Sequence, residues 1–306
     1  MADKKRRSKK TNRKETLSKD YKTKNKKPQT NKKKTIKKVL IILLLIILIL
    51  AGIAFGIMCG IIKEAKLTAK DFAIKNENSI VLDKDGNKIA ELSGTENRKY
   101  VSISEMAPYL PEAYIAIEDE RFRDHMGIDV KRTFAATVKY AFSKIGIGSS
   151  SYGGSTITQQ LVKNIMKDKA DSGTAGMERK IREMSRAYKV ESMLTKKQII
   201  EKYLNIIFIG GNDLHGVEYG AQYYFAKSAK DLDLAESAFL AGINDGPNMY
   251  NPYGEEDNSE LIKSRTKLVL HFMKEQSRIS DDPAEAEKLY NEAVEKVEKG
   301  FEFKKG

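Results

Sequence analysis

The strongest constraint on the fold of this chain is an uncharged apolar segment near its N-terminus. Residues 39–62 form a run of 24 residues, mostly Ile and Leu, without one charged side chain. At about 1.5 Å rise per residue, such a run spans roughly 36 Å as a helix, enough to cross a hydrocarbon core of about 30 Å. A cleaved signal peptide is the alternative, but the run is long for one and no small-x-small cleavage site clearly follows it. The segment therefore predicts a transmembrane helix over 39–62.

The formal net charge of +13 is concentrated before this segment. Residues 1–38 hold 18 Lys and Arg against three acidic residues, a net charge of +15, which leaves −2 for the other 268 residues. Because this tail has almost no apolar side chains to form a core, we expect it to be disordered. By the positive-inside rule the tail lies in the cytoplasm, where it can hold anionic lipid headgroups, and residues 63–306 lie outside. A nucleic-acid-binding arm is the alternative, but the adjacent span favours the membrane.

The part of the chain after the span is expected to be mainly α-helical. The one cysteine of the chain, Cys59, lies inside the span, so the part outside has no internal disulfide and must rely on its own core. Residues 63–78 are expected to form a short helical stalk, and residues 79–92 alternate about an Asp-Gly pair, as in a β-hairpin. Strand-like segments are scarce afterwards, and the helical pattern begins near Pro111. Further helices are expected at 129–143, 155–167, 176–194, 196–209, 214–227, 232–243, 258–275 and 282–299. The domain plan is a stalk and hairpin at 63–110, a helical domain at 111–278 and a C-terminal helical extension at 279–306.

Two segments rich in Gly and Ser, 146–154 and 169–176, flank one short polar helix. They are either ordinary connectors or mobile loops around a substrate cleft, and their position on both sides of one helix favours the cleft. Before them, residues 128–147 carry apolar residues at helical spacing, among them Phe134 and Phe142, interspersed with Lys and Arg. This is either a core helix or a basic amphipathic helix at a membrane interface, and the nearby anchor adds weight to the second explanation.

Three consecutive carboxylates, Glu118, Asp119 and Glu120, follow the apolar run 114–117. A solvated, charged helix end is the ordinary explanation of such a cluster. The alternative is acid/base chemistry, because a carboxylate beside apolar walls can have its proton affinity raised toward the working pH.

Two further polar groups follow along the chain. The helix expected from 155 begins with good N-cap residues and offers amides and a cation within about one turn, which suits phosphate or sugar hydroxyls as well as an ordinary exposed face. Arg179 and Glu183 are four residues apart and share a helix face, where a surface ion pair is the default explanation. The functional alternative has Arg179 and Lys180 meeting an anionic leaving group, with Glu183 as a second carboxylate.

Taken in order, these blocks resemble the peptidoglycan glycosyltransferases (glycosyltransferase family 51), the polymerase domains of class A penicillin-binding proteins and of monofunctional enzymes. The family's first motif, Glu-Asp-x-x-Phe-x-x-His-x-Gly, is matched at 118–127. The second, Gly-x-Ser-Thr-Ile-Thr-Gln-Gln-x-x-Lys-Asn, is matched in full up to Asn164, and the third, Arg-Lys-x-x-Glu, at 179–183. The Tyr-Leu-Asn and Leu-Ala-Glu blocks fit at 203–217 and 234–252. The resemblance covers about residues 70–275.

Two departures from the family pattern lie in blocks that we interpret as structural. Residues 243–247 read Ile-Asn-Asp-Gly-Pro where the family usually has Leu-Pro-Gln-Ala-Pro, and Ile209 stands where an aromatic residue is common. Both are expected to affect local packing more than catalysis.

The resemblance implies a lysozyme-like helical domain that polymerises lipid II. The growing chain donates its anomeric carbon with inversion, undecaprenyl pyrophosphate leaves, and the 4-hydroxyl of the next lipid II is the acceptor. Glu118 is expected to be the general base, and Glu183 a second catalytic carboxylate that orients the cations or contacts the donor. Charge growing on pyrophosphate would be met by cations. The residues expected to bind substrate are Asp119, Ser155, Gln159, Gln160, Lys163, Asn164, Arg179 and Lys180, with Asp119 and His125 shaping the site more than transferring protons.

The resemblance also sets the expected cofactors and partners. The resemblance implies a divalent cation, Mg²⁺ or Mn²⁺, between pyrophosphate and Glu118 or Asp119, although the sequence has no dedicated cage, and no organic cofactor is expected. The partners are lipid II, the nascent glycan strand, the lipid bilayer, and a separate transpeptidase with other cell-wall synthesis proteins, but no nucleic acid. Transpeptidation itself is not expected, because a Ser-x-x-Lys match at 264–267 lacks its partner motifs.

Two other function classes compete with this expectation. A helical domain with two carboxylates outside the membrane is also typical of a lysozyme-like peptidoglycan hydrolase. The cations at Lys163 and Arg179 discriminate against it, because the leaving group of a glycosidase is a neutral sugar. A non-catalytic membrane scaffold or a DNA-binding protein built on the basic tail is the third class, and the intact carboxylate and lysine pattern argues against it.

Overall fold

The computed structural model describes residues 29–72, 79–85, 88–92, 97–144, 153–167, 173–211 and 213–304. The chain divides into two compact units, Met1–Gly60 and Ile61–Gly306. The expected disorder of the tail over 1–28, most of the expected loops at 146–154 and 169–176, and the hairpin turn at 86–87 lie outside the described residues.

The elements are mostly helices, joined by short strands. In chain order they are α2 (Gln29–Glu64), η1 (Ala69–Phe72), β1 (Ser79–Leu82), β2 (Lys88–Leu92), β3 (Asn97–Arg98), η2 (Ile103–Glu105), α3 (Tyr109–Glu118), α4 (Val130–Lys144), α5 (Ile157–Met166), α6 (Gly173–Met193), α7 (Lys196–Ile206), β4 (Phe208–Gly210), β5 (Leu214–His215), α8 (Val217–Phe225), η3 (Ala229–Asp231), α9 (Leu234–Ile243), α10 (Ser259–Glu275) and α11 (Pro283–Lys299), where η marks a 3-10 helix. The expected mainly α-helical architecture is confirmed.

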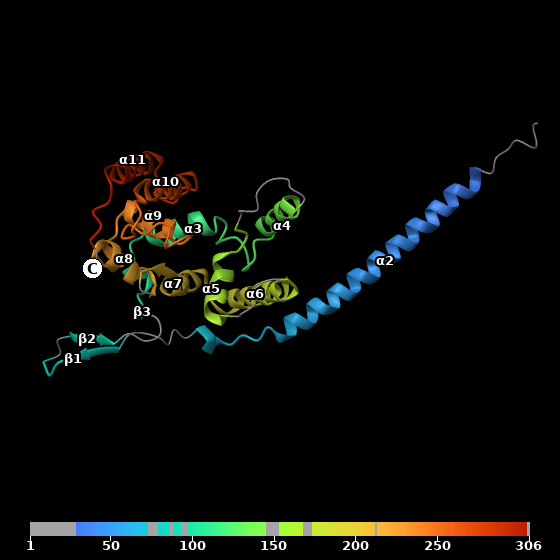
Figure 1. Ribbon diagram of the computed structural model, residues 1–306, viewed down its shortest axis with the longest axis horizontal. Helices are drawn as coiled ribbons and strands as arrows, with labels where there is room; N and C mark the ends of the chain where they lie inside the picture. The colour runs from blue at the N-terminus through green and yellow to red at the C-terminus, as the bar shows by residue number, and fades with distance from the viewer. Residues whose placement is uncertain are drawn as a thin grey trace, which may run out of the picture. The chain divides into compact units, whose positions relative to one another are not determined.

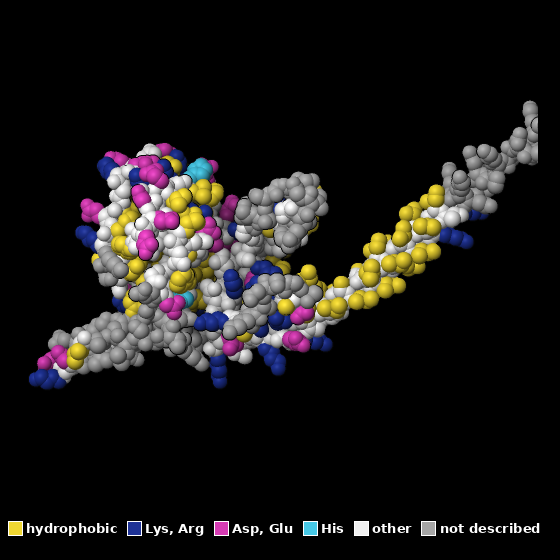
Figure 2. All heavy atoms as spheres, in the orientation of Figure 1, with side chains coloured by type: hydrophobic (Ala, Val, Ile, Leu, Met, Phe, Trp, Pro, Cys, Tyr) yellow, Lys and Arg dark blue, Asp and Glu magenta, His cyan; other side chains and the backbone are white. Residues whose placement is uncertain are grey.

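Helix α2 contains the predicted membrane span. Among the described residues, one helix has the length and apolar composition needed to cross a membrane, over Lys34–Glu64. Its exposed Ile and Leu side chains form the apolar surface seen in Figure 2. The helix begins at Gln29, ten residues before the apolar run, so the expectation of disorder up to residue 38 is wrong for 29–38. Lys and Arg have good helix propensity, so a basic segment attached to an apolar helix can extend it.

The core of the second unit is built around α9. All ten residues of this helix are buried, and it packs against α3 and α10, with α11 behind α10 (Figure 1). A helix that is apolar on all sides has no face suited to water, which explains its central position. Its one acidic residue, Glu236, closes a capping box with Asp233 and binds Lys227 at 2.7 Å.

A second layer consists of α5, α6 and α7, in which α5 packs against both of the others (Figure 1). Helix α5 begins with a capping box in which the Thr156 hydroxyl accepts from the Gln159 amide and the Gln159 side chain accepts from the Thr156 amide. Helix α7 begins with the same device at Thr195 and Gln198. These caps satisfy amide groups that have no partner inside the helix. They define where α5 begins, and that position matters for the site.

The strands confirm the predicted hairpin and correct the expected bounds of two helices. Strands β1 and β2 pair antiparallel, as the predicted hairpin requires. A second sheet, ordered β3-β5-β4, was not expected, and it ends α7 at Ile206 instead of 209 and delays α8 to Val217. Gly210, Gly211 and Gly216 have positive φ here, a conformation that ends helices.

The stalk is not a continuous helix, since residues 65–68 are irregular before η1, and α6 begins at Gly173 instead of 176.

The C-terminal segment joins the same compact unit as the helices before it. Phe301 and Phe303, beyond α11, pack against Phe225 of α8 and Phe239 of α9, with ring centroids 5.2–5.8 Å apart. Offset and edge contacts between aromatic rings at such distances are favourable. The segments 63–110 and 279–306 therefore pack within one unit together with the helical domain between them.

Gly127, between α3 and α4, is expected to tolerate no side chain. Its φ is +80°, and a Cβ atom would lie 2.6 Å from the backbone oxygen of Ala187 in α6. Because neither backbone can give way, Gly127→Ala should destabilise the fold by about 3 kcal/mol, measured as a drop in the thermal unfolding midpoint in detergent. Gly176→Ala is the matched control, because that glycine lies in α6 with no atom within 4 Å of a new Cβ. The control should be more stable than the wild type by up to about 1 kcal/mol in the free energy of unfolding. Equal midpoints for the two variants would contradict the packing described.

Candidate active site

The carboxylate of Glu118, the last residue of α3, is held from two sides. Its Oε2 accepts a hydrogen bond from Nε2 of Gln160 at 2.7 Å, and its Oε1 accepts one from Nδ2 of Asn244 at 2.9 Å. Gln160 comes from α5, and Asn244 directly follows α9. The side chain is partly exposed and lines a cleft. The structure thus places an oriented carboxylate where a substrate can reach it.

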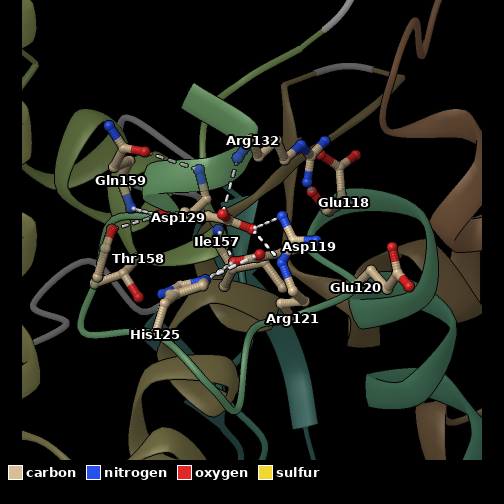
Figure 3. Close-up of polar contacts among 12 residues, drawn as sticks. Glu118, Asp119, Glu120, Arg121, His125, Asp129, Arg132, Ile157, Thr158 and Gln159 are labelled. Atoms are coloured by element: carbon tan, nitrogen blue, oxygen red, sulfur yellow. Dashed lines mark hydrogen bonds and ion pairs between the residues drawn. The ribbon is translucent and has the colours of Figure 1, made fainter. Parts of the chain in front are cut away.

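The next residue, Asp119, has a different environment. Its side chain is fully buried, His125 Nε2 lies 3.0 Å from both of its oxygens, and the backbone amide of Ile157 donates to Oδ2 at 3.0 Å. Figure 3 shows Asp119 between His125 and the start of α5. This position suits the expectation that Asp119 shapes the site, and its binding of substrate stays a prediction. Its carboxylate ties the end of α3 to the N-terminus of α5, where a negative charge is favoured.

Arg132 connects α4 to the same place. Its guanidinium donates to the backbone oxygens of Glu118 and, at 3.0 Å, of Gly153. The first turn of α4 is held by Asp129, which accepts from the Arg132 amide at 2.9 Å and pairs with Arg121 at 2.7 Å (Figure 3). Burial alone would raise the pKa of the Asp129 carboxyl, but these hydrogen bonds outweigh it and hold the pKa below its ordinary value. Asp129 therefore stays ionised and keeps Arg121 and α4 in place.

A cationic group lies at the junction of α5 and α6. The buried carboxylate of Glu183 accepts hydrogen bonds from Lys180, from Arg179 at 3.5 Å and from Gln159 at 3.3 Å. Lys180 Nζ also donates to the hydroxyl of Ser155 at 2.8 Å. The structure thus brings together five residues that the sequence predicted for the site. The side chains of Arg179 and Lys180 remain partly exposed, at 26% and 37%, so they can still meet an anion.

Two of these five residues are buried. Gln159 is fully buried and closes the capping box of α5, so it supports the helix and Glu183, and its contact with sugar or phosphate stays a prediction. Glu183 is 5% exposed and engaged by three donors, which favours the expectation that it orients the cations over a direct contact with the donor. Lys163 is exposed on α5 and Asn164 is partly exposed beside it.

A cleft of about 930 Å³ lies beside Glu118. Its lining includes Lys131, Arg132 and Lys139 from α4 and His271, Phe272 and Glu275 from α10. Cations along one helix of the lining suit a substrate that carries phosphate.

The divalent cation expected from the sequence has no group of protein ligands among the described residues. Within the described ranges no group of three His, Cys, Asp or Glu side chains could hold an ion. The oxygens of Glu118 are engaged by two amides, and those of Asp119 by His125 and Ile157. A bridging cation through pyrophosphate stays a prediction, and no step of the mechanism below depends on it.

Sequence reasoning missed three residues of the site. Asn244 was noted as a departure that would affect packing, yet its amide contacts Glu118. Tyr203 was assigned to the core, yet its hydroxyl donates to Oε1 of Gln160 at 3.0 Å and accepts from Asn244 at 3.1 Å. Arg132 was counted among the cations of an amphipathic helix. A polar residue directly after the apolar run 234–243 was the one available signal for Asn244.

Comparisons with known proteins identify the family of this chain. The family described as Transglycosylase matches residues 85–274. Penicillin-binding protein 1A of Clostridium botulinum is 36% identical over 253 residues, which are 81% of this chain and 29% of that protein. Penicillin-binding protein 1F of Bacillus subtilis is 37% identical over 222 residues, 72% of this chain and 28% of that protein. This chain thus spans less than a third of the length of these relatives.

Among solved structures, penicillin-binding protein 1A of Haemophilus influenzae is 21% identical and covers 76% of this chain and 22% of that chain, with a TM-score of 0.39.

Proposed function

Because this chain belongs to the transglycosylase family, we propose that it is a membrane-anchored peptidoglycan glycosyltransferase that polymerises lipid II into glycan strands. The observation that carries the proposal is the pair of sites on helix α5. Its Gln160 holds the accessible carboxylate of Glu118, and its N-terminal turn, through Ser155 and Gln159, contacts Lys180 and Glu183. One short helix thus contacts both the base on α3 and the cationic group on α6. This arrangement suits a transfer in which one substrate loses a proton and the other loses a pyrophosphate.

In the proposed mechanism Glu118 accepts the proton of the acceptor 4-hydroxyl as that oxygen attacks the anomeric carbon of the growing strand. A sugar hydroxyl is a poor nucleophile until its proton is taken, so the base contributes directly to the rate. The new bond joins the acceptor oxygen to the anomeric carbon, and the bond from that carbon to undecaprenyl pyrophosphate breaks. Attack from the face opposite the leaving group inverts the anomeric centre.

The charge that grows on the pyrophosphate is met by Arg179 and Lys180, with Lys163 exposed on the neighbouring helix. Glu183 holds the first two in place, so little reorganisation is needed during the reaction. This cationic group also weighs against the hydrolase alternative, in which a neutral sugar would leave.

The membrane enters the proposal through α2 and α4. We propose that α2 anchors the chain with the N-terminus in the cytoplasm and the catalytic unit outside the cell membrane, as the lysines that precede the span indicate. On α4, Val130 and Phe134 are 74% and 70% exposed, and Lys131 and Lys139 of the same helix line the cleft. The alternative that this segment is a core helix is therefore wrong. A basic helix with exposed apolar residues suits the bilayer interface, from which a lipid-linked substrate would enter the cleft.

The chain has no tryptophan, so a single Trp reports the position of α4. In proteoliposomes the fluorescence of Phe134→Trp should be strongly quenched by lipids brominated on their acyl chains, because its ring would sit among those chains. Leu261→Trp is the matched control, since Leu261 is 50% exposed on α10. We expect that variant to be quenched several-fold less. Equal quenching of both variants, or none at Phe134→Trp, would contradict the membrane contact of α4.

The function itself is tested with the full chain in detergent. Incubated with lipid II, it should produce glycan strands that are resolved on a gel and degraded by lysozyme. The proposal fails if the folded chain forms no polymer under conditions in which a class A penicillin-binding protein does. We further propose that a separate transpeptidase cross-links the strands that this chain makes. We propose no nucleic-acid partner.

A further inference from the structure

The ends of helices α3 and α9 lie side by side, and each presents a polar residue to the other. Tyr114, four residues before Glu118, donates from its hydroxyl to the backbone oxygen of Leu240 at 2.9 Å. Leu240 in turn lies four residues before Asn244. Both helices are buried where they touch, so the packing of one turn sets the position of the next. The packing of α3 on α9 thus positions Asn244 Nδ2 and Glu118 Oε1 for their 2.9 Å contact.

The contact belongs to a closed ring of four side chains. Asn244 donates to Glu118 and to the hydroxyl of Tyr203, Tyr203 donates to Oε1 of Gln160, and Gln160 donates to the other oxygen of Glu118. Tyr203 is fully buried, and its ring meets that of Tyr114 edge-on at 6.1 Å. Such a ring holds all four side chains in one arrangement, because moving any member breaks two hydrogen bonds.

The proton positions in this ring are determined by chemistry. Burial, followed by the charge of Glu118, raises the pKa of Tyr203 well above its ordinary value, so its hydroxyl keeps its one proton. That proton goes to the oxygen of Gln160, because the Asn244 nitrogen can only donate. Gln160 then has only its NH₂ group to offer to Glu118. Both oxygens of Glu118 accept, which is the pattern of an ionised carboxylate, and each retains a lone pair for a substrate hydroxyl.

We propose that Asn244 is a positioning residue for the transfer reaction, which orients the Glu118 carboxylate by donating to Oε1. The inference rests on the proposed function, in which Glu118 is the base. A base must be ionised to take a proton, and hydrogen bonds to a carboxylate favour its charged form. The family that this chain resembles usually has a proline here, which offers no side-chain donor, so this support is a feature of the present chain. Asn244 is not the only residue that holds the end of α9, because Arg265 also donates to the Gly242 oxygen at 3.1 Å.

The test uses two variants of the full chain that are close to asparagine in size. Asn244→Leu removes the donor, and Asn244→Asp places a second carboxylate against Glu118. For Asn244→Leu, kcat with lipid II should fall about tenfold while KM stays within about twofold, because the base is affected more than binding. The acid limb of the pH–rate profile should move about one unit to higher pH, since a carboxylate that has lost a donor is protonated more readily. Asn244→Asp should move the limb further in the same direction, because two adjacent carboxylates resist joint ionisation.

The matched controls are Asn291→Leu and Asn291→Asp on α11. Asn291 also donates from its amide to a glutamate, Glu287, at 3.3 Å, but on an exposed surface outside the cleft. Both controls should keep the wild-type kcat and pH profile.

The outcomes separate this inference from the proposed function. If Glu118→Gln is inactive and Asn244→Leu keeps the wild-type kcat and acid limb, the role of Asn244 is overturned and the proposed base stands. If Asn244→Leu and Asn244→Asp lower the unfolding midpoint without moving the acid limb, Asn244 is only structural. If Glu118→Gln remains active, both proposals are overturned.

Discussion

Replacing Glu118 with glutamine is expected to lower kcat for lipid II polymerisation by about 10³-fold or more. Glutamine has the shape of glutamate but cannot take a proton from the acceptor hydroxyl, and general acid–base catalysis contributes about 10²–10⁴-fold. The change also sets an amide against two amide donors, from Gln160 and Asn244, so the oriented carboxylate of the ring is lost. Gel analysis of glycan strands made by equal amounts of wild type and Glu118→Gln measures the effect.

The fold should survive this substitution, because Glu118 is only partly buried and lies at the end of α3. Glu260→Gln on α10 is the matched control, since its side chain is 85% exposed and lies far along the chain from the site. It should leave polymerisation unchanged. A Glu118→Gln protein that still polymerises within tenfold of the wild-type rate would remove Glu118 from the role of base.

The second large effect is expected at Asp119, and it concerns stability. This carboxylate is fully buried and accepts from His125 and from the first amide of α5. Asp119→Ala would leave both donors buried without their acceptor and break the link between α3 and α5. Breaking a buried, hydrogen-bonded charge in this way costs about 3–5 kcal/mol. We therefore expect the free energy of unfolding, measured by denaturant titration in detergent, to fall by that amount.

The control for this measurement is Asp124→Ala. Asp124 lies in the same segment between α3 and α4 but is exposed. Exposed substitutions usually change stability by less than about 0.5 kcal/mol. If the two alanine variants unfold at the same denaturant concentration, Asp119 does not hold α3 and α5 together.

The parts of the fold that could be predicted are those with strong local signals. The span at 39–62 and the buried helix α9 follow from composition alone, and the hairpin from its alternation about Asp-Gly. The sheet β3-β5-β4 could not be found in this way, because strands of two or three residues contain no periodicity. The helix expected to 209 ends at 206 because the backbone becomes extended at Ile207 and the chain enters that sheet.

In the site, too, the residues that could be predicted are those with a local sequence pattern. Glu118, Gln160 and the group around Glu183 stand in patterns that the sequence displays. Asn244 could not be placed, because it is 126 residues from Glu118 and only the packing of α9 on α3 brings them together. The capping role of Gln159 was missed although its signal was present. Thr156 and Gln159 have the spacing of a capping box, which takes the Gln159 side chain back to the helix start.

The central claim is that this chain transfers the growing strand from its lipid pyrophosphate to the next lipid II, and its most direct test is the stoichiometry of the leaving group. With the full chain in detergent and lipid II labelled in both the sugar and the lipid, undecaprenyl pyrophosphate and new glycosidic bonds are counted over time. The account predicts one pyrophosphate lipid released for each bond formed, with the anomeric configuration inverted. Release of soluble sugars from finished peptidoglycan, without polymer or pyrophosphate lipid, would contradict it and identify a hydrolase.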